Sequence, residues 1–378
     1  MSTETPEIRF DNPLMPLNLR RWPRRAGEKL RAWDNADQLL LAQLAETGHG
    51  RIMVFNDQHG ALSLPLGERL LVSCGDSWLA RRAISTNARD NDLVWEAERW
   101  CWPDQPLPAD VDLVVMRVPK SLALFEYQLA GITRDLPAGV PVWVGGMDKH
   151  LPETLKQTLS RWLQAVNTGR GVRKARVFGG VTAGPGPSSG WPKTLRIEPQ
   201  GWQLSVHAGV FGGARQDAGG ALLMRHVPVD IAGHIADLGC GNGMVGLWAA
   251  QRNPQARVVF CDESYQAIRS ARENAGRLLD EGRADFHLGN GLDRFDQRFE
   301  AILLNPPFHR GHAVDDAMAR MLVRQSSRQL LPEGCLTLVG NRHLDYHRLL
   351  PRYFGQVEQL AADKRFVVFR ASGSKEAK

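Results

Sequence analysis

Two short segments in the second half of this 378-residue sequence carry residue types suited to chemistry. The first is a glycine-rich turn, DLGCGNG, in which Asp237 is followed by Gly239, Gly241 and Gly243. Glycines let the backbone turn sharply and leave room for a ligand over the N-terminus of a following helix. The second is NPPFH, which begins at Asn305. We therefore expect a bound small molecule beside a turn that has polar chemistry of its own.

The glycine-rich turn is compatible with two cofactors. The stretch GNGMVG fits the dinucleotide fingerprint GxGxxG, and Asp262, about 20 residues further on, can accept hydrogen bonds from ribose hydroxyls. Asp237 distinguishes between the two cofactors, because a carboxylate at the mouth of the turn repels the pyrophosphate of a dinucleotide. The same charge favours a ligand with an ammonium and a sulfonium group, such as S-adenosylmethionine (SAM). The turn thus favours SAM, with NAD as the alternative.

The NPPF turn has the groups needed to hold a planar NH2 group. The side-chain oxygen of Asn305 can accept one amine hydrogen, and the proline-fixed carbonyl of Pro306 can accept the other. Phe308 offers a face on which a flipped-out base can stack. Holding both hydrogens turns the nitrogen lone pair toward an electrophile. Asn305, Pro306, Pro307 and Phe308 are therefore the expected catalytic residues.

The pattern around these segments predicts the elements that position them. Apolar runs predict strands at residues 231–238, 257–261, 285–288, 301–304, 335–339 and 366–369. Helical patterns lie between them at residues 245–251, 265–279 and 318–331, the last stopped by residues 332–334. This alternation is typical of a doubly wound α/β fold with a mostly parallel sheet. Both chemical segments then follow strands at its carboxyl edge, where ligands bind in such sheets.

The first half of the chain repeats this scheme. Strands are expected at residues 51–55 and 112–116, and the serine-to-asparagine spacing is ten from Ser77 to Asn87 and from Ser264 to Asn274. The repeat predicts a duplicated domain. A Gly-, Pro- and Ser-rich linker at residues 179–192 separates residues 1–178 from residues 193–378.

The first copy lacks the residues that would do the chemistry. Its turn, residues 56–60, has a single glycine, and Arg117 stands where the second copy has Asn305. An arginine has no acceptor for amine hydrogens. We therefore predict that the first half binds neither SAM nor the target base.

The positive net charge of the chain favours an anionic binding partner. The formal net charge is +6, and Arg20, Arg21, Arg24 and Arg25 surround a tryptophan in the N-terminal leader, a mixture suited to phosphate contact and base stacking. A second cluster comprises Arg170, Arg173, Lys174 and Arg176. Both are candidate RNA-binding segments, although a solvated surface also accounts for such charges.

Several classes of protein are excluded or disfavoured. Five cysteines without a CxxC pair argue against a disulfide scaffold and a zinc framework, so no metal is expected. HExxH, GxSxG and P-loop motifs are absent from the sequence. No apolar run approaches the roughly 18 residues of a membrane span, and the N-terminus has no apolar signal core, which predicts a cytoplasmic protein without a membrane partner.

The two segments together are similar to the class I SAM-dependent N-methyltransferases that modify exocyclic amines. The form NPPFHxxH, with a degenerate N-terminal copy, resembles the ribosomal RNA guanine-N2 methyltransferases, and the resemblance covers nearly the whole chain. The length and the leader NPLMPLNLRRWP favour the members that act on 23S rRNA of the large subunit, with the 16S rRNA members of the small subunit as the alternative. The resemblance implies two tandem Rossmann-like class I SAM methyltransferase domains, of which the second is active.

The resemblance also implies roles for individual residues. The methionine part of SAM would be held by Asp237, Gly239, Gly241 and Gly243. Asp262 would hold the ribose, with Glu263 as the alternative, and Asn290 would contact the adenine. His309 and His312 are candidates for a base, but an NPPF turn can act without one.

Other functions stay open at this level. NPPF turns also serve methylation of adenine N6, cytosine N4 and glutamine amides, because each presents a planar NH2 group. A non-catalytic RNA-binding or ribosome-assembly factor, with a vestigial site, is a further alternative.

Overall fold

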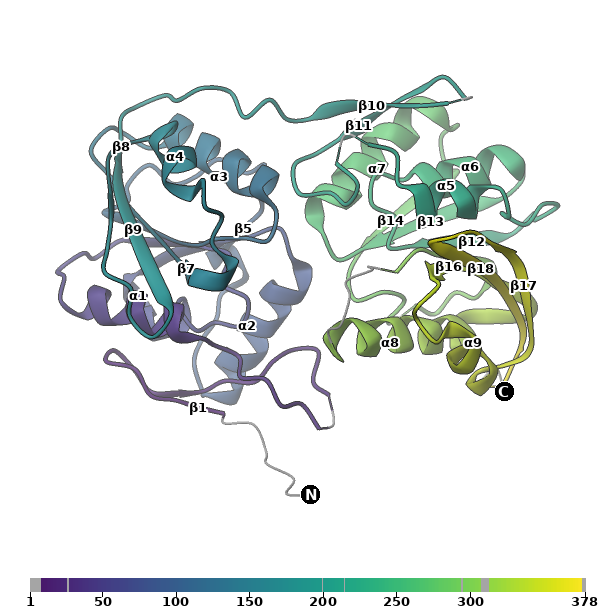
Figure 1. Cartoon of the computed structure of the whole chain (residues 1–378), viewed down its shortest axis with the longest axis horizontal. Coiled ribbons are helices and arrows are strands. Elements are labelled where there is room, and N and C mark those ends of the chain that lie inside the picture. The colour runs from purple at the N-terminus through teal and green to yellow at the C-terminus, as the bar shows by residue number, and fades with distance from the viewer. Residues whose placement is uncertain are drawn as a thin grey trace. The chain divides into compact units, whose positions relative to one another are not determined.

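The computed structural model describes residues 8–25, 27–198, 200–213, 215–293, 295–306 and 313–375, with side chains omitted for 313–316. The chain divides into two compact units, Met1–Trp191 and Pro192–Lys378 (Figure 1). Each unit is described separately below. No helix among the described residues has the length and apolar character that a bilayer crossing requires.

The C-terminal unit is built on a seven-stranded sheet in the order β14-β13-β12-β15-β16-β18-β17. Its first five strands along the chain are parallel, and β18 runs antiparallel to both of its neighbours. The strands are β12 (His234–Leu238), β13 (Arg257–Asp262), β14 (Ala284–Leu288), β15 (Phe299–Leu304), β16 (Leu330–Asn341), β17 (Phe354–Ala362) and β18 (Phe366–Ser374). All six strands expected from the sequence are present, and the edge strand β17 is additional.

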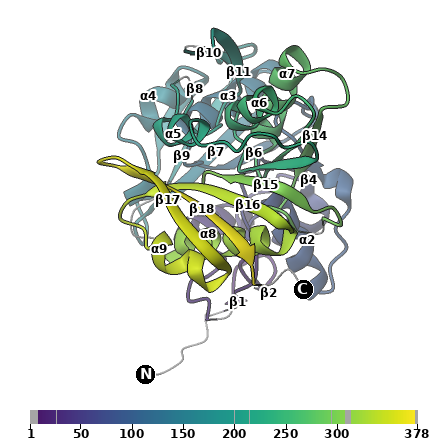
Figure 2. The ribbon, with the colours of Figure 1, turned by 90° about the vertical axis from the view of Figure 1, so that its right-hand side faces the viewer.

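Helices cover both faces of this sheet. They are α5 (Ala218–Met224), α6 (Met244–Arg252), α7 (Tyr265–Leu278), α8 (Ala313–Gln329) and α9 (Tyr346–Leu349), with a 3-10 turn at Leu350–Arg352. Figures 1 and 2 show α5, α6 and α7 on one face and α8 and α9 on the other. A hairpin of β10 (Lys193–Ile197) and β11 (Trp202–Val206) precedes them, and β11 lies against α7.

The helix expected at residues 318–331 has different bounds. It begins at Ala313 and ends at Gln329, and β16 starts at once and continues through residues 332–334, which the sequence suggested as a helix stop. Leu330 is buried and pairs with Phe299, and the pairing then skips to Ala301 with Cys335. The bulge between these pairs accommodates the proline, which cannot donate a ladder hydrogen bond.

The N-terminal unit has a seven-stranded sheet with the same order, β5-β4-β3-β6-β7-β9-β8. Its strands are β3 (Ile52–Phe55), β4 (Leu70–Cys74), β5 (Trp100–Cys101), β6 (Leu113–Arg117), β7 (Pro141–Met147), β8 (Leu163–Thr168) and β9 (Ala175–Thr182). A small pair, β1 (Arg9–Phe10) and β2 (Leu17–Asn18), precedes them. The shared strand order agrees with the duplication inferred from the sequence.

The helices of this unit also cover both faces. They are α1 (Asn35–Ala45), α2 (Trp78–Asp90), α3 (Leu122–Asp135) and α4 (Leu155–Ser160), with 3-10 turns at Leu64–Arg69, Ala97–Arg99 and Asp148–His150. Side chains of α1 and α2 pack into one hydrophobic core and those of α3 and α4 into another, on opposite faces of the sheet (Figure 1).

The asparagine found in both copies has the same structural role in each. Asn274 of α7 accepts from the backbone N–H of Ser205 and donates to its carbonyl, at 2.7 and 2.9 Å. Asn87 of α2 makes the same pair of bonds with the backbone of Arg20, at 3.1 and 2.9 Å. The repeated spacing in the sequence thus reflects a repeated tertiary contact.

The expected linker is shorter than the sequence suggested. Residues 179–182 belong to β9, which pairs with both β7 and β8. Gly180 is close-packed rather than flexible, since a Cβ there would lie 3.1 Å from the side chain of Leu163. Residues 183–192 contain no helix or strand.

Candidate active site

The glycine-rich turn joins β12 to α6 in a conformation that requires glycine. Gly239, Gly241 and Gly243 have φ angles of 76°, 54° and 86°. Side chains with a Cβ rarely adopt this left-handed region. The N–H groups of Gly239 and Cys240 both donate to the carbonyl of Cys261, which ties the turn to the end of the neighbouring strand.

Asp237 lies beneath this turn, where it fixes the start of α6. Its side chain is buried, and Oδ2 accepts the N–H of Gly246 at 2.8 Å. Burial raises the pKa of Asp237 to about 7, and the charge of Asp262 adds to the rise. Gly246 is required here, because a Cβ would lie 2.5 Å from the Phe260 ring and 2.8 Å from Oδ2 of Asp237.

Asp262 ends β13 and holds the turn from the side. It accepts the N–H of Gly241 through Oδ2 and that of Ser264 through Oδ1, both at 3.0 Å. Burial raises the pKa of the Asp262 carboxyl. Its position at the next strand end is the one expected for a ribose ligand.

Asn290 follows β14, at the same edge of the sheet. Its side-chain amide donates to the sulfur of Met321 at 3.7 Å, and its backbone carbonyl accepts from Gln325 at 3.1 Å. Both partners lie on α8, so Asn290 lies between the sheet edge and that helix.

Asn305 immediately follows β15 and lies next to the glycine-rich turn. A Cβ on Gly239 would be 3.5 Å from the Asn305 carbonyl oxygen. The side-chain nitrogen of Asn305 donates to Oδ2 of Asp217 at 2.8 Å. Its side-chain oxygen Oδ1 is buried and has no hydrogen-bond partner among the described residues. Buried acceptors of this kind are uncommon and cost free energy, so this atom is poised to accept a donor from a ligand.

The rest of the NPPF segment is only partly described. Pro306 is buried, whereas Pro307, Phe308, His309 and His312 lie outside the described residues.

Asp217 is a site residue that sequence reasoning missed. It is the N-cap of α5, and its Oδ2 also accepts the N–H of Gly220 at 2.6 Å. The available signal was an aspartate directly before a short apolar helix, which is a common N-cap pattern. That pattern gives no indication that the side chain also meets Asn305, 88 residues away.

The cofactor-binding residues expected from the sequence are therefore brought together. The carboxyl edge of four adjacent strands carries the turn after β12, Asp262 at the end of β13, Asn290 after β14 and Asn305 after β15. Left-handed glycines and a buried acceptor without a described partner fit a cofactor at the turn and an amine substrate. The expectation that Asp237 places a charge at the mouth of the turn is wrong, because this side chain is buried beneath the turn, where it holds the amide of Gly246.

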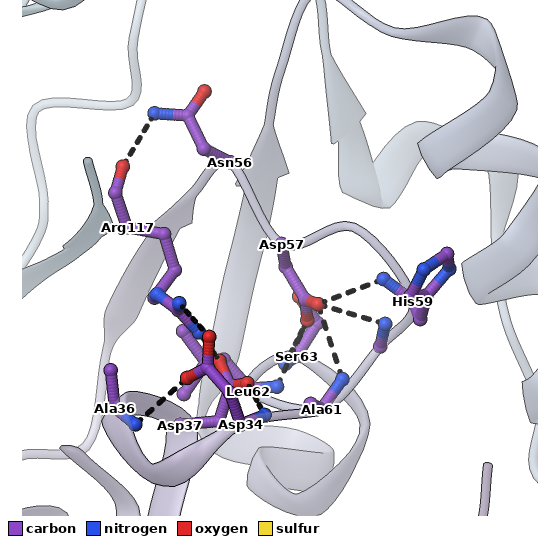
Figure 3. Close-up of polar contacts among 11 residues, drawn as sticks. Asp34, Ala36, Asp37, Asn56, Asp57, His59, Ala61, Leu62, Ser63 and Arg117 are labelled. Carbon is purple, nitrogen blue, oxygen red and sulfur yellow. Dashed lines mark hydrogen bonds and ion pairs between the residues drawn. The ribbon is translucent and has the colours of Figure 1, made fainter. Parts of the chain in front are cut away.

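The corresponding turn of the N-terminal unit is filled by its own side chains (Figure 3). Phe55 pairs with Cys74 as Leu238 pairs with Cys261, so Asn56 stands at the position of Gly239. Asn56 has a φ of 62°, and its side chain donates to the carbonyl of Arg117 at 2.9 Å.

Asp57 takes up the backbone donors of this turn. Its two oxygens accept N–H groups at 2.8–3.2 Å from five consecutive residues, His59, Gly60, Ala61, Leu62 and Ser63 (Figure 3). These are donors that an anionic or polar ligand would otherwise use. Beside it, burial lowers the pKa of His59 to about 3.

Arg117, at the position of Asn305, is also engaged within its own unit. Its guanidinium pairs with Asp37 and, at 2.7 Å, with Oδ2 of Asp34, the N-cap of α1 (Figure 3). The pair of Arg117 with Asp34 thus corresponds to the pair of Asn305 with Asp217.

The leader arginines lie along α2. Arg20 is exposed and its backbone is held by Asn87. Arg24 pairs with Asp90, and Arg21 lies 3.7 Å from Glu28. Arg25 is half-buried. In the second cluster, Arg176 pairs with Asp148 at 3.1 Å, while Arg170, Arg173 and Lys174 are exposed at the β8–β9 turn.

Comparisons with known proteins match the chain along nearly its whole length. A family model described as RLMG N-terminal domain matches residues 7–184, and the methyltransferase small domain matches residues 201–370. A ribosomal RNA large subunit methyltransferase G of Alcanivorax borkumensis is 43% identical over 96% of this chain and 97% of its own length. The protein of the same name from Klebsiella pneumoniae is 38% identical over 94% and 96%.

A solved structure has the same architecture. The 16S rRNA N2 methyltransferase of T. thermophilus, in complex with AdoMet and guanosine, superposes with a TM-score of 0.75 over 96% of this chain and 97% of its own. At 22% identity, this likeness shows a shared fold.

Proposed function

Because this chain belongs to the ribosomal RNA large subunit methyltransferase G family, we propose that it methylates the exocyclic N2 amine of a guanine in 23S rRNA. The protein is a SAM-dependent methyltransferase with two class I domains, of which the N-terminal one is degenerate. An rRNA substrate implies that it works in the cytoplasm.

The buried oxygen of Asn305 is the observation that carries the proposal. Its amide nitrogen is committed to Asp217, so the side chain cannot turn over without losing that bond. The oxygen is therefore fixed as an acceptor with no partner in the described chain. An exocyclic amine supplies the hydrogen that this atom lacks.

The glycine-rich turn and its carboxylates would hold the cofactor. Gly239 and Gly241 leave room at the turn, since an added Cβ would come no closer than 3.5 and 3.9 Å to other residues, with Asp262 at its side and Asn290 at the next strand end. Gly243 is close-packed instead, because a Cβ there would lie 3.2 Å from Ala271 of α7. Asp237 supports the turn by accepting the N–H of Gly246 in α6. SAM supplies an electrophilic methyl group on a positively charged sulfur.

The chain itself positions the amine for attack. Asn305 accepts one amine hydrogen and the carbonyl of Pro306 accepts the other, so the nitrogen lone pair points out of the plane of the base. This orientation is the main catalytic requirement. The product nitrogen loses one proton, and the turn needs no resident base because that proton is acidic once the nitrogen is positively charged.

We also propose that the N-terminal unit contacts RNA through its leader. Arg20 is exposed, and its backbone is held by Asn87. Arg24 and Arg21 already lie beside carboxylates, those of Asp90 and Glu28. Arg20 is therefore expected to contribute most to phosphate binding, with Arg21, Arg24 and Arg25 in support.

The test has a cellular and a purified part. Ribosomal RNA from a strain without the protein should lose one N2-methylguanosine from 23S rRNA, mapped by nucleoside mass spectrometry of fragments from both subunits. Purified protein should transfer labelled methyl from SAM to that RNA, and Asn305→Ala should abolish transfer while calorimetry still shows SAM binding. Loss of the modification from 16S rRNA, or an intact set in both, would overturn the proposal.

A further inference from the structure

One oxygen of the Asp217 carboxylate, Oδ1, accepts no hydrogen bond from the described residues, although Asp217 contacts the amine-binding residue Asn305. Both hydrogen bonds that described residues give to its side chain, from Asn305 and Gly220, end on Oδ2. No described cation forms an ion pair with it, and its side chain is only partly buried. Gly220 keeps this arrangement open, because a Cβ there would lie 3.2 Å from Oδ2.

Only one of the candidate amines has a ring donor for such an oxygen. In guanine, the N2 amine is next to N1–H, which donates a hydrogen bond. In adenine and cytosine, the amine is next to a ring nitrogen with a lone pair, which a carboxylate repels. A carboxylate beside an amine-holding asparagine therefore matches guanine and mismatches the other two bases.

We propose that Asp217 is a substrate-recognition residue, whose Oδ1 accepts N1–H of the target guanine while its Oδ2 holds the amide of Asn305. The proposal rests on the proposed function and adds to it the origin of the base specificity. Asn305 then reads the amine, which several bases share, and Asp217 reads the ring position that distinguishes guanine.

The N-terminal unit supports this assignment by contrast. It keeps an aspartate N-cap at the same place, Asp34, but that carboxylate is paired with the guanidinium of Arg117. The unit that has lost the amine-binding asparagine thus carries a neutralised carboxylate, and the unit that keeps the asparagine carries one without a described cation.

The experiment compares two target bases in one RNA. A fragment of 23S rRNA containing the mapped target is made by ligation with either guanine or 2-aminopurine at that position. 2-Aminopurine keeps the 2-amine, but its N1 is an acceptor without hydrogen. We expect the wild-type protein to prefer guanine in kcat/KM by roughly 10- to 100-fold or more.

Asp217→Asn should change this preference. Its oxygen can still accept from Asn305 and Gly220, which places an NH2 group where Oδ1 stood. That group donates to N1 of 2-aminopurine and opposes N1–H of guanine. Transfer to guanine should fall and transfer to 2-aminopurine should rise, so that the ratio drops by about 100-fold or more. The missing 6-oxygen of 2-aminopurine affects both proteins alike and cancels in the comparison.

Two further variants serve as controls for the helix cap and for the chemical change itself. Asp217→Ser can still cap α5 but has no second oxygen, so it should lose the preference while keeping SAM affinity. Asp345→Asn makes the same chemical change at an exposed N-cap of α9 in the same unit and should leave the ratio unchanged.

The outcomes separate the two claims. If wild-type protein transfers no methyl group to the guanine fragment, the proposed function fails. If it does, and Asp217→Asn lowers both rates equally or leaves the ratio unchanged, Asp217 only positions Asn305 or the helix, and this inference is overturned.

Discussion

Asn56 occupies in the N-terminal unit the position that Gly239 holds in the C-terminal unit, with a similar left-handed φ of 62° against 76°. The backbone path is therefore kept while a side chain fills the space above it. This side chain reaches the carbonyl of Arg117, the counterpart of the Asn305 carbonyl near Gly239. The predicted loss of cofactor binding in the first copy thus needs no change of fold.

This relationship predicts a matched pair of variants. Gly239→Asn should abolish SAM binding, because asparagine tolerates the left-handed backbone but its side chain enters the cofactor space. Titration calorimetry of the full chain should show one SAM per chain for the wild type and a loss of affinity of about 100-fold or more for the variant. Asn56→Gly should leave the stoichiometry at one, and a second binding site in either protein would contradict the degeneracy of the first unit.

Asp237 should make the chain less stable as the pH rises toward neutral. Its pKa is raised from 3.8 to about 7 in the folded state, so between these values the folded form keeps a proton that the unfolded form has lost. Its contribution is full below about pH 4 and is lost as the pH rises to about 7, with a slope of up to about 1.4 kcal/mol per pH unit.

Asp237→Asn removes this titration but can still accept the amide of Gly246. The difference in the free energy of unfolding, variant minus wild type, should therefore grow between pH 5 and pH 7 in urea titrations followed by tryptophan fluorescence. A difference independent of pH would show that Asp237 is ionised throughout.

His59 should have the opposite effect in the N-terminal unit. Burial lowers its pKa from 6.5 to about 3, and its Nδ1 is buried without a partner among the described residues. Between these two pKa values, His59 is protonated in the unfolded chain and neutral in the folded chain. The free energy of unfolding therefore decreases as the pH falls below about 6.5, by up to about 1.4 kcal/mol per pH unit.

The substitution His59→Asn tests this, since asparagine is the residue at the corresponding position, 242, of the other unit. The variant should lose less stability than the wild type between pH 7 and pH 5. Equal losses in urea unfolding would place the proton uptake elsewhere.

The leader arginines should set the salt dependence of RNA binding. Each phosphate contact adds about 0.7–0.9 to the slope of log affinity against log salt. Replacing Arg20, Arg21, Arg24 and Arg25 by glutamine should lower that slope by roughly 1 to 3, and Arg20→Gln alone should account for more of it than Arg24→Gln, whose partner is Asp90.

A control uses arginines of the same unit that lie on the α3 and α4 side of the sheet. Arg134 pairs with Asp135 and Arg161 with Glu126, and replacing both by glutamine should leave the slope unchanged. A slope that is the same in the leader variant and the wild type would remove the leader from the RNA interface.

Much of the fold and site follows from short-range sequence patterns. Buried strands such as β13 and β15 are largely apolar, and the glycine-rich turn is recognisable because left-handed φ angles favour glycine. The duplication was detectable because Asn87 and Asn274 each hold a distant backbone segment and so keep their spacing from a helix-capping serine.

The features that the sequence did not predict depend on long-range contacts or on exposure. The edge strand β17 has a largely exposed face and no apolar run, so its pattern is that of a polar loop. Asp217 is indistinguishable from any N-cap until α5 is packed against β16 and its N-cap side chain meets Asn305. Gly179 and Gly180 suggested a linker because their composition shows flexibility but not the strand that packs against them.

The self-contained turn of the N-terminal unit also bears on its evolution. Substitution of Asp57 would leave five backbone N–H groups without their acceptor. A glycine at position 56 alone would leave those groups bonded to Asp57. Reversion to a cofactor site therefore needs at least two substitutions, of which the one at Asp57 is destabilising on its own. We therefore expect the turn of the first copy to persist in its present form, because single substitutions toward a cofactor site destabilise the unit or change nothing.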